Sequence, residues 1–207
     1  CGKDAQGSVI YLLTDIEEQG GKPVGGVYVS RDRGRTWKPV NAAWFAGDWK
    51  AGDRLPSFPA LAVCQDSPST VYLSCAQWYD KPAGTPRRNF GILKTTDGGA
   101  AWDWVYRCTN DSILSQNGPG GWMEKNYGPE WGEYPLSLGV CPSNADICYA
   151  SDFGCTYRTA DGGKTWEQVY ADMLPDGSAA TRGVNVTTCY GVHFDPFDPQ
   201  HVFISYT

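Results

Sequence analysis

Aromatic rings and carboxylates gather in three segments of this 207-residue chain, at positions 41–49, 76–89 and 118–134. The rings that we single out are Trp44, Trp49, Trp78, Tyr79, Trp122, Trp131 and Tyr134, and the carboxylates are Asp80, Glu124, Glu130 and Glu133. Flat rings stack on the apolar C–H face of a sugar, while carboxylates accept hydrogen bonds from its hydroxyl groups. These residue types therefore favour an oligo- or polysaccharide ligand.

The same rings have a structural alternative. Trp and Tyr side chains could hold long loops against the ends of the strands that these loops connect. For any single ring the sequence leaves both roles open, whereas the clustering of rings beside carboxylates favours ligand binding.

Composition argues against several other kinds of site. The net charge is −6 and no run of Lys or Arg is interleaved with aromatics, so we expect no nucleic-acid partner. The eight cysteines form no C-x-x-C pair and only His193 and His201 could add nitrogen ligands, so we expect neither a metal nor another cofactor. No apolar stretch reaches the roughly 18 residues of a membrane-spanning helix.

An eight-residue pattern, [ST]-x-D-x-G-x-x-W, occurs at Ser30–Trp37, Thr95–Trp102 and Thr159–Trp166. Its aspartates are spaced by 65 and 64 residues. The residue types suit a hairpin turn, because the Asp can accept backbone N–H bonds, the Gly can take a positive φ and the Trp can pack into the sheet. We therefore assign the three aspartates to turns and not to catalysis.

Runs of β-branched and aromatic residues around each pattern align as four strands per repeat. The first strands are expected at 61–64, 138–141 and 191–194, the second at 71–74, 147–151 and 202–205, the third at 26–30, 91–95 and 156–159, and the fourth at 102–106 and 166–170.

The eight-residue pattern resembles the Asp box, or BNR repeat, of sialidases, family 74 glycoside hydrolases, sortilin-type receptors and a photosystem assembly factor. This resemblance implies an all-β fold, a β-propeller segment of about three and a half four-stranded blades joined by Asp-box hairpin turns. We expect one domain over residues 1–207, with blades near 9–60, 61–137, 138–190 and 191–207. Closed propellers typically have about four to eight blades, so we expect further blades from the parent chain or another subunit.

In such blades the Asp-box turns emerge on one face, and the connections between the second and third strands and between blades emerge on the other. All long insertions of this chain belong to the second kind. They are expected as loops at 14–23, 41–59, 76–89, 107–135 and 171–189. Long loops are uncommon without a functional reason, so this elaborated face is where we expect the ligand.

Within the Asp-box group, the chain most resembles the family 74 glycoside hydrolases, which are xyloglucanase-like. Residues 149–158 resemble the D-x-G-G-x-Y-R motif of that family, with Cys155 in place of the second Gly, and the resemblance implies that Asp152 is a catalytic carboxylate. Residues 193–199 resemble the stretch near the second catalytic Asp, but Tyr190 and Gly191 stand where an acidic residue is expected.

The partner of Asp152 is therefore open among Asp80, Glu124, Glu130 and Glu133. An inverting glycosidase needs its two carboxyl groups roughly 6.5–9.5 Å apart. The structural alternative for Asp152 is a strand-end aspartate that caps a turn.

Taken with the aromatic segments, the resemblance implies a secreted carbohydrate-active protein, a glycoside hydrolase that acts on a polysaccharide through paired carboxylates. The alternative is a non-catalytic propeller that recognises a glycan or a protein, as sortilin-type receptors do. A sialidase is a more distant resemblance, because Arg54-Leu55-Pro56 follows the first Asp box instead of preceding it.

The cysteine count and two N-x-[ST] sequons, at Asn110 and Asn185, favour a secreted or cell-surface location, extracellular or periplasmic. Cys1 would allow a lipoprotein, although a chain boundary at this position explains it equally well. Cys141 and Cys148 fall on successive strands joined by a short turn, so a disulfide between them is geometrically plausible.

Overall fold

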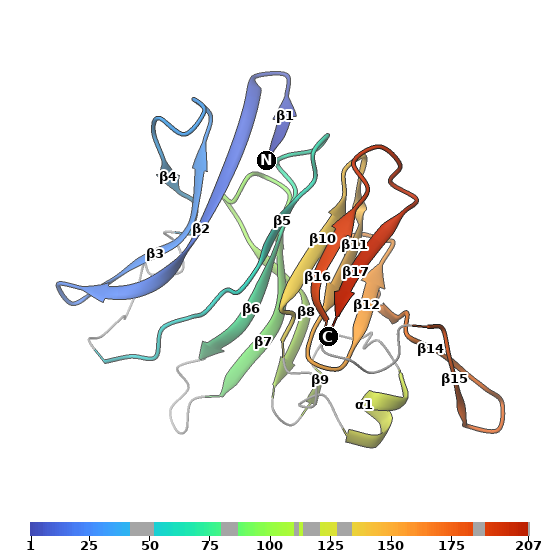
Figure 1. Cartoon of the computed structure of the whole chain (residues 1–207). Coiled ribbons are helices and arrows are strands. Elements are labelled where there is room, and N and C mark those ends of the chain that lie inside the picture. Colours follow the sequence, from blue (N-terminus) through green and yellow to red (C-terminus); the bar gives the residue numbers. More distant parts are fainter. Residues whose placement is uncertain are drawn as a thin grey trace.

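The computed structural model describes residues 1–41, 52–79, 87–109, 112–113, 121–127, 134–183 and 189–206. Antiparallel strands make up most of these residues, and one short helix, α1 (Trp122–Tyr127), lies outside the sheets (Figure 1). The predicted all-β fold of four-stranded blades is confirmed.

Three large sheets follow one another along the chain. The first contains β1 (Gly2–Asp4), β2 (Gly7–Gln19), β3 (Lys22–Ser30) and β4 (Lys38–Pro39). The second contains β5 (Leu61–Val63), β6 (Val71–Tyr79), β7 (Arg88–Thr95), β8 (Asp103–Thr109) and β9 (Ser112–Ile113). The third contains β10 (Ser137–Cys141), β11 (Asn144–Ser151), β12 (Thr156–Thr159) and β13 (Glu167–Gln168).

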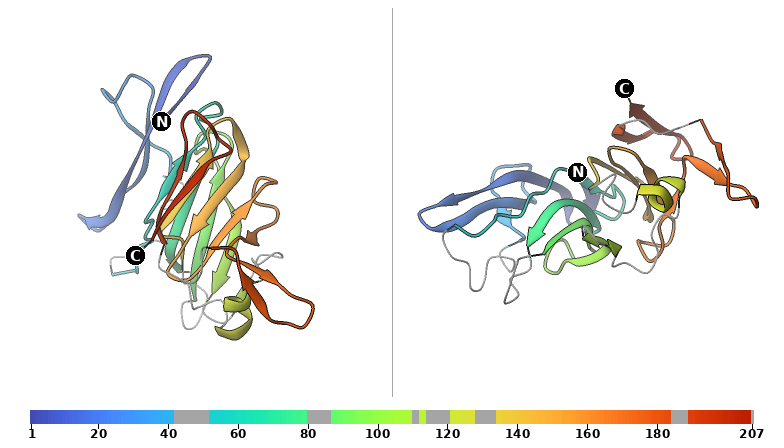
Figure 2. Two further views of the ribbon diagram at one scale, coloured as in Figure 1. Left: turned by 45° about the vertical axis from the view of Figure 1, so that its right-hand side comes forward. Right: turned by 90° about the horizontal axis from the view of Figure 1, so that it is seen from below.

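Two hairpins complete the described structure. One pairs β14 (Ala171–Met173) with β15 (Ala179–Thr181), and the other pairs β16 (Cys189–Phe194) with β17 (Val202–Tyr206). The second hairpin supplies the first two strands of a fourth blade and packs on the third sheet, where Val192 lies against Gly139. Figure 2 shows the large sheets and this hairpin standing one after another in chain order.

The strands are longer than predicted at the far end of two sheets. Residues 14–23, expected as a loop, continue β2 and β3 as far as a two-residue turn at Gly20 and Gly21, whose φ values of 61° and 79° suit a tight hairpin. A β-bulge between Thr14 and Glu17 interrupts the alternation that would have revealed this pairing. The second sheet repeats the feature, because β6 reaches Tyr79 past a bulge that begins at Cys75.

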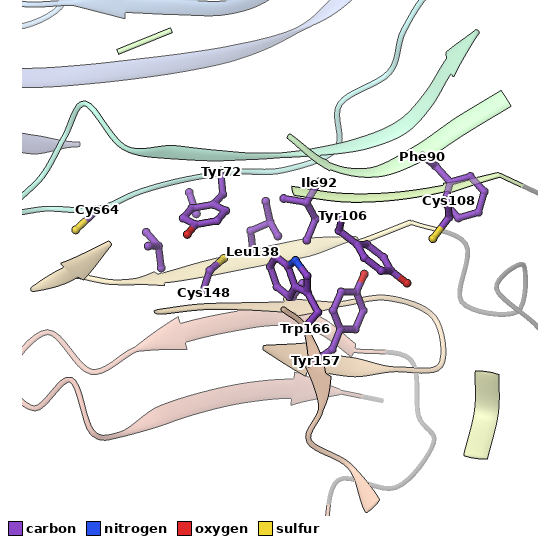
Figure 3. Packing of buried hydrophobic residues seen from close by; sticks show 13 residues of the cluster. Cys64, Tyr72, Phe90, Ile92, Tyr106, Cys108, Leu138, Cys148, Tyr157 and Trp166 are labelled. Carbon is purple, nitrogen blue, oxygen red and sulfur yellow. The ribbon is translucent and has the colours of Figure 1, made fainter. Parts of the chain in front are cut away.

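The hydrophobic core lies between the sheets. Between the second and third sheets, Tyr72, Ile92 and Tyr106 face Tyr157 and Trp166, all of them buried (Figure 3). A second cluster joins the first sheet to the second and contains Val27, Phe58, Leu73, Cys75 and Leu93. Face-to-face burial of this kind is how neighbouring blades stabilise one another.

The three Asp boxes form the same turn. In the third box the Asp161 carboxylate accepts hydrogen bonds from the Thr165 backbone N–H at 2.9 Å and the Thr165 hydroxyl at 2.6 Å. These bonds, the hydroxyl bond foremost, lower the pKa of Asp161 to about 2. The hydroxyl of Thr159 accepts from the Gly163 N–H at 2.8 Å. Both oxygens of the Asp161 carboxylate thus accept hydrogen bonds from within the turn. This supports the structural assignment of these aspartates.

The cysteine prediction was wrong. Cys141 and Cys148, the predicted disulfide pair, are both free. A bulge at the end of β10 places Cys148 opposite Val140 and Cys141 opposite Asn144, so the two cysteines do not face each other across the hairpin. Cys148 is instead buried in the core between the sheets.

Candidate functional site

The end of the sheets that carries the insertions is distinct from the end that carries the short turns. α1, β9 and the β14–β15 hairpin lie at the lower end in Figure 1, while the β1–β2, β5–β6, β10–β11 and β16–β17 turns lie at the upper end. β11 runs towards the lower end, so the turn that follows its last residue lies at that end. Asp152 is the first residue of that turn.

Asp152 caps its own turn between β11 and β12. Its Oδ1 accepts hydrogen bonds from the backbone N–H groups of Gly154, at 2.8 Å, and Cys155, at 2.6 Å. Its own N–H donates to the Cys155 carbonyl at 3.0 Å. This is the geometry of a strand-end aspartate that fixes a turn, and it holds the carboxyl group in one orientation.

Burial changes the acidity of this carboxyl group. Asp152 is only 5% exposed, and the loss of solvation raises its pKa to about 6. The two N–H bonds lower the pKa, but by less than burial raises it. A carboxyl group with a pKa near 6 keeps its proton in weakly acidic solution, which is the property required of a general acid.

An aromatic pair adjoins Asp152. The ring of Phe153, which is 43% exposed, meets the ring of Tyr134 edge to face with centroids 6.3 Å apart. The guanidinium carbon of Arg88 lies 5.8 Å from the Tyr134 ring centre. Arg88 is held in place by two hydrogen bonds to the Ala76 carbonyl, at 2.9 Å and 3.1 Å. Segments from two sheets thus converge beside the Asp152 turn.

A second group of aromatic residues lies next to Cys155, which belongs to the same turn. The Cys155 Sγ lies 4.0 Å from the Tyr170 hydroxyl, and the Tyr170 ring meets Trp122 of α1 edge to face at 6.4 Å. Trp122 also lines a groove of about 450 Å³ between α1 and the β14–β15 hairpin. Asn126, Ser178 and Thr181 line the same groove, so it combines an indole with amide and hydroxyl groups.

The structure separates the described members of the predicted set of rings into two groups. Tyr134 and Trp122 lie near the Asp152 turn, whereas Trp78 and Tyr79 lie at the end of β6. Trp78 packs on Phe58 with ring centroids 6.3 Å apart, and Arg54 lies 4.8 Å from the Tyr79 ring centre. Both rings thus contact the segment that leads into β5.

The remaining predicted residues fall outside the described parts of the chain. They are Trp44, Trp49, Asp80, Glu130, Trp131 and Glu133, together with the side chain of Glu124. The carboxylate partner of Asp152 therefore stays a prediction.

Phe153, Arg88 and Tyr170 were not among the predicted site residues. Phe153 could have been found, because it occupies the variable position of the motif that contains Asp152. Arg88 and Tyr170 have no local signal, since their proximity to the turn depends on how separate segments pack.

The described residues contain no cluster of three or more His, Cys, Asp or Glu side chains placed to hold a metal ion. In the same part of the chain, no helix has the length and apolarity needed to cross a membrane.

Comparison with known proteins finds an Asp-box repeat in the chain. The family model described as BNR/Asp-box repeat matches residues 28–39. No curated protein sequence matches the chain significantly.

Two solved structures are similar in outline. The crystal structure of a GH74 enzyme from Niastella koreensis has 20% identity and a TM-score of 0.46, and the match covers 94% of this chain and 26% of that one. The structure titled "YCF48 bound to D1 peptide" has 14% identity and a TM-score of 0.41, with 99% and 66% of the two chains covered. The chain thus spans about a quarter of the length of the first. The chain therefore contains a BNR/Asp-box repeat, and three equivalent turns of this kind lie in successive antiparallel sheets that are arranged as the blades of a β-propeller.

Proposed function

We propose that this chain is part of a carbohydrate-active protein, a glycoside hydrolase that cleaves a polysaccharide with Asp152 as its acid. The observation that carries the proposal is the protonatable carboxyl group itself. Asp152 has a pKa of about 6, is fixed by two backbone N–H groups, and stands at the elaborated end of the sheets beside an exposed aromatic ring. Strongly shifted carboxyl groups in such positions are characteristic of catalytic sites.

In the proposed reaction, protonated Asp152 donates its proton to the glycosidic oxygen as the bond to the leaving sugar breaks. The second carboxylate, from Asp80, Glu124, Glu130 or Glu133, activates a water molecule or attacks the sugar directly. The separation of the two carboxyl groups would decide between these outcomes. Phe153, Tyr134 and Trp122 offer ring faces for stacking on sugar residues.

A non-catalytic glycan- or protein-recognition propeller is the second candidate. The observation in its favour is that the only hydrogen bonds to the Asp152 side chain from described residues come from its own turn, and that the residue is almost fully buried. On this reading Asp152 only shapes the turn, and the exposed rings bind a ligand that is not cleaved.

We also propose that the protein acts outside the cytoplasm, secreted or at the cell surface, because polymeric glycans are met there. The predicted Cys141–Cys148 disulfide is not formed. The proposal therefore rests on the substrate class and on the N-x-[ST] sequons at Asn110 and Asn185.

The test is a hydrolysis screen of the full-length parent protein against β-glucan, xyloglucan, pectic and sialylated glycans. Asp152→Asn is the informative variant, because the Asn Oδ1 can still accept the N–H bonds of Gly154 and Cys155 while the proton is lost. Asp146→Asn is the matched control, since Asp146 lies at the opposite end of β11 and is exposed.

The enzyme proposal predicts cleavage of at least one glycan by the parent and by Asp146→Asn, and a loss of about a hundredfold or more in Asp152→Asn with folding intact. Equal cleavage by all three proteins would remove Asp152 from the chemistry. Binding of a glycan without cleavage by any of them would favour the recognition propeller.

A further inference from the structure

Cationic side chains line a groove beside the first Asp box. The groove has a volume of about 430 Å³ and lies between this box and the turn that joins β1 to β2. Four of its lining residues are cations, Lys3, Arg31, Arg33 and Arg35. Its other lining residues are polar side chains and one glycine, so no apolar side chain from the described residues lines it. We name it the basic groove and define it by the four cations.

The basic groove lies at the opposite end of the sheets from Asp152. The β1–β2 turn is at the upper end in Figure 1, whereas Asp152 follows β11 at the lower end. Register places Ser30, the first residue of the box, opposite Ile10 near the start of β2. Both walls of the groove are therefore turns of one blade, and the groove is complete within that blade.

Two carboxylates lie beside the basic groove, and both are already engaged. The Arg31 Nη1 donates to the Asp4 Oδ2 at 2.8 Å. The Asp32 carboxylate accepts from the Thr36 backbone N–H at 2.8 Å and from the Thr36 hydroxyl at 2.6 Å. Two carboxylates thus face four cations, which leaves an excess of positive charge here in a chain whose net charge is −6.

Three of the four cations are available to a ligand. Within the described part of the chain, Lys3, Arg33 and Arg35 form no ion pair, and all three are exposed. Their N–H groups can therefore donate to an anion without first breaking a contact inside the protein.

The arginines distinguish the first box from the other two. The second, fourth and sixth positions of the pattern are Arg31, Arg33 and Arg35 in the first box. The same positions are Thr96, Gly98 and Ala100 in the second box, and Ala160, Gly162 and Lys164 in the third. All three boxes form the same turn, so the turn itself does not require arginine at these positions.

Arg33 also has a backbone conformation that suits glycine better. Its φ is 64°, and its equivalents Gly98 and Gly162 both have a φ of 77°. A side chain in this region costs free energy relative to glycine. An unfavourable conformation that presents an exposed cation points to a role for that cation beyond the turn.

We propose that the basic groove binds an acidic polysaccharide through its carboxylate or sulfate groups. Guanidinium groups donate paired N–H bonds that match two oxygens of such an anion. The lining favours a polysaccharide over other polyanions, because protein ligands are usually anchored by apolar or aromatic side chains and single-stranded nucleic acids by stacking on aromatic rings. Neither kind of side chain lines the groove among the described residues. Binding at this end of the sheets is independent of cleavage at Asp152.

Isothermal titration calorimetry tests the binding. The protein is the full-length parent with Asp152→Asn, so that any glycan stays intact. The charged ligands are polygalacturonate, which carries carboxylates, and dextran sulfate. Their matched controls are methyl-esterified polygalacturonate and dextran, which keep the sugar chain and lack the charge. We expect at least one charged glycan to bind, with an affinity that falls by about tenfold between about 50 and 200 mM salt, and no binding of its uncharged control.

The two charged ligands separate carboxylate from sulfate recognition. Failure of both to bind would overturn the proposal, as would equal affinity for an uncharged control. Tighter binding of polyglutamate or of duplex DNA would also overturn it, because the groove would then select a different class of polyanion.

Variants locate the binding in the groove. Arg33→Gly combined with Arg35→Ala gives the first box the residues that the second box has at these positions, so the turn is retained. The double variant should lower the affinity by about tenfold or more, and Arg35→Ala alone by about threefold. Lys164→Ala is the matched control, because it removes an exposed cation from the sixth position of the third box.

The control should change the affinity by less than about twofold, because Lys164 lies outside the basic groove. An equal loss in Arg35→Ala and Lys164→Ala would contradict the proposal, since the attraction would then come from charge anywhere on the protein. Undiminished affinity in the double variant, with an unfolding transition like that of the parent, would contradict it as well.

Discussion

Replacing Asp152 by Asn should change how the stability of the protein depends on pH. The folded protein holds the Asp152 pKa at about 6, against 3.8 for an unperturbed Asp, and burial is the main cause. The folded state therefore binds this proton more tightly than the unfolded state does. The contribution of Asp152 to the free energy of unfolding is fully present below pH 3.8. It is lost as the pH rises through 6, because the carboxyl group must then ionise in a buried position.

The size of the effect follows from the shift. A change of about two pKa units corresponds to about 3 kcal/mol over the whole range. Between pH 4 and pH 7, the free energy of unfolding of the parent should fall by about 2–3 kcal/mol relative to Asp152→Asn, whose side chain does not titrate. The other carboxyl groups are common to both proteins and cancel in the difference.

Urea unfolding of the two proteins at a series of pH values measures this quantity. With a slope of about 2–3 kcal/mol per molar urea, the difference between their midpoints should change by about 1 M across the range. A difference that is independent of pH would mean that Asp152 is solvated and has an ordinary pKa. A difference that changes in the opposite direction would mean that the two N–H bonds outweigh burial.

Two further predictions concern the scaffold. Arg33→Gly should stabilise the protein by about 1 kcal/mol, because Arg33 has a φ of 64° where the other two boxes have Gly; thermal unfolding that shows a lower melting temperature would refute this. Tyr72→Phe should destabilise it by about 1 kcal/mol, because the Tyr72 hydroxyl donates to the Ala145 carbonyl of the next blade at 2.8 Å; an unchanged urea midpoint would show that this bond adds nothing.

The repeat made the blade architecture predictable from sequence. Each repeated feature of the box has a local role, since Asp161 accepts a hydrogen bond from an N–H group of its own turn and Gly163 takes a φ of 94°. Such local requirements can be recognised without knowing the rest of the fold. The strands next to the boxes were accordingly predicted within a few residues of β7, β8 and β12.

Features that depend on bulges were missed. The bulge between Thr14 and Glu17 lets a polar stretch, including Asp15, continue in β2 although the alternation of side chains fails there. The bulge after Val140 separates Cys141 from Cys148 and removes the predicted disulfide. A shift of register at a bulge is invisible in a pattern that is read strand by strand.

The candidate site was only partly accessible from sequence. The motif around Asp152 pointed to that residue, but its burial and acidity arise from segments far apart in the chain. Phe153 comes from the same turn, whereas Tyr134 and Tyr170 approach from before β10 and after β13. Which rings gather beside a carboxyl group is decided by packing between blades, which local patterns do not encode.

The dependence of kcat/KM on pH, measured on the glycan that the screen identifies, tests the central claim most directly. If Asp152 is the general acid, activity should fall as the pH rises through about 6, because the proton that it must donate is then lost. The same alkaline fall should appear in Asp146→Asn. Activity that stays constant to pH 8, or an Asp152→Asn variant that retains the parent profile, would contradict the assignment.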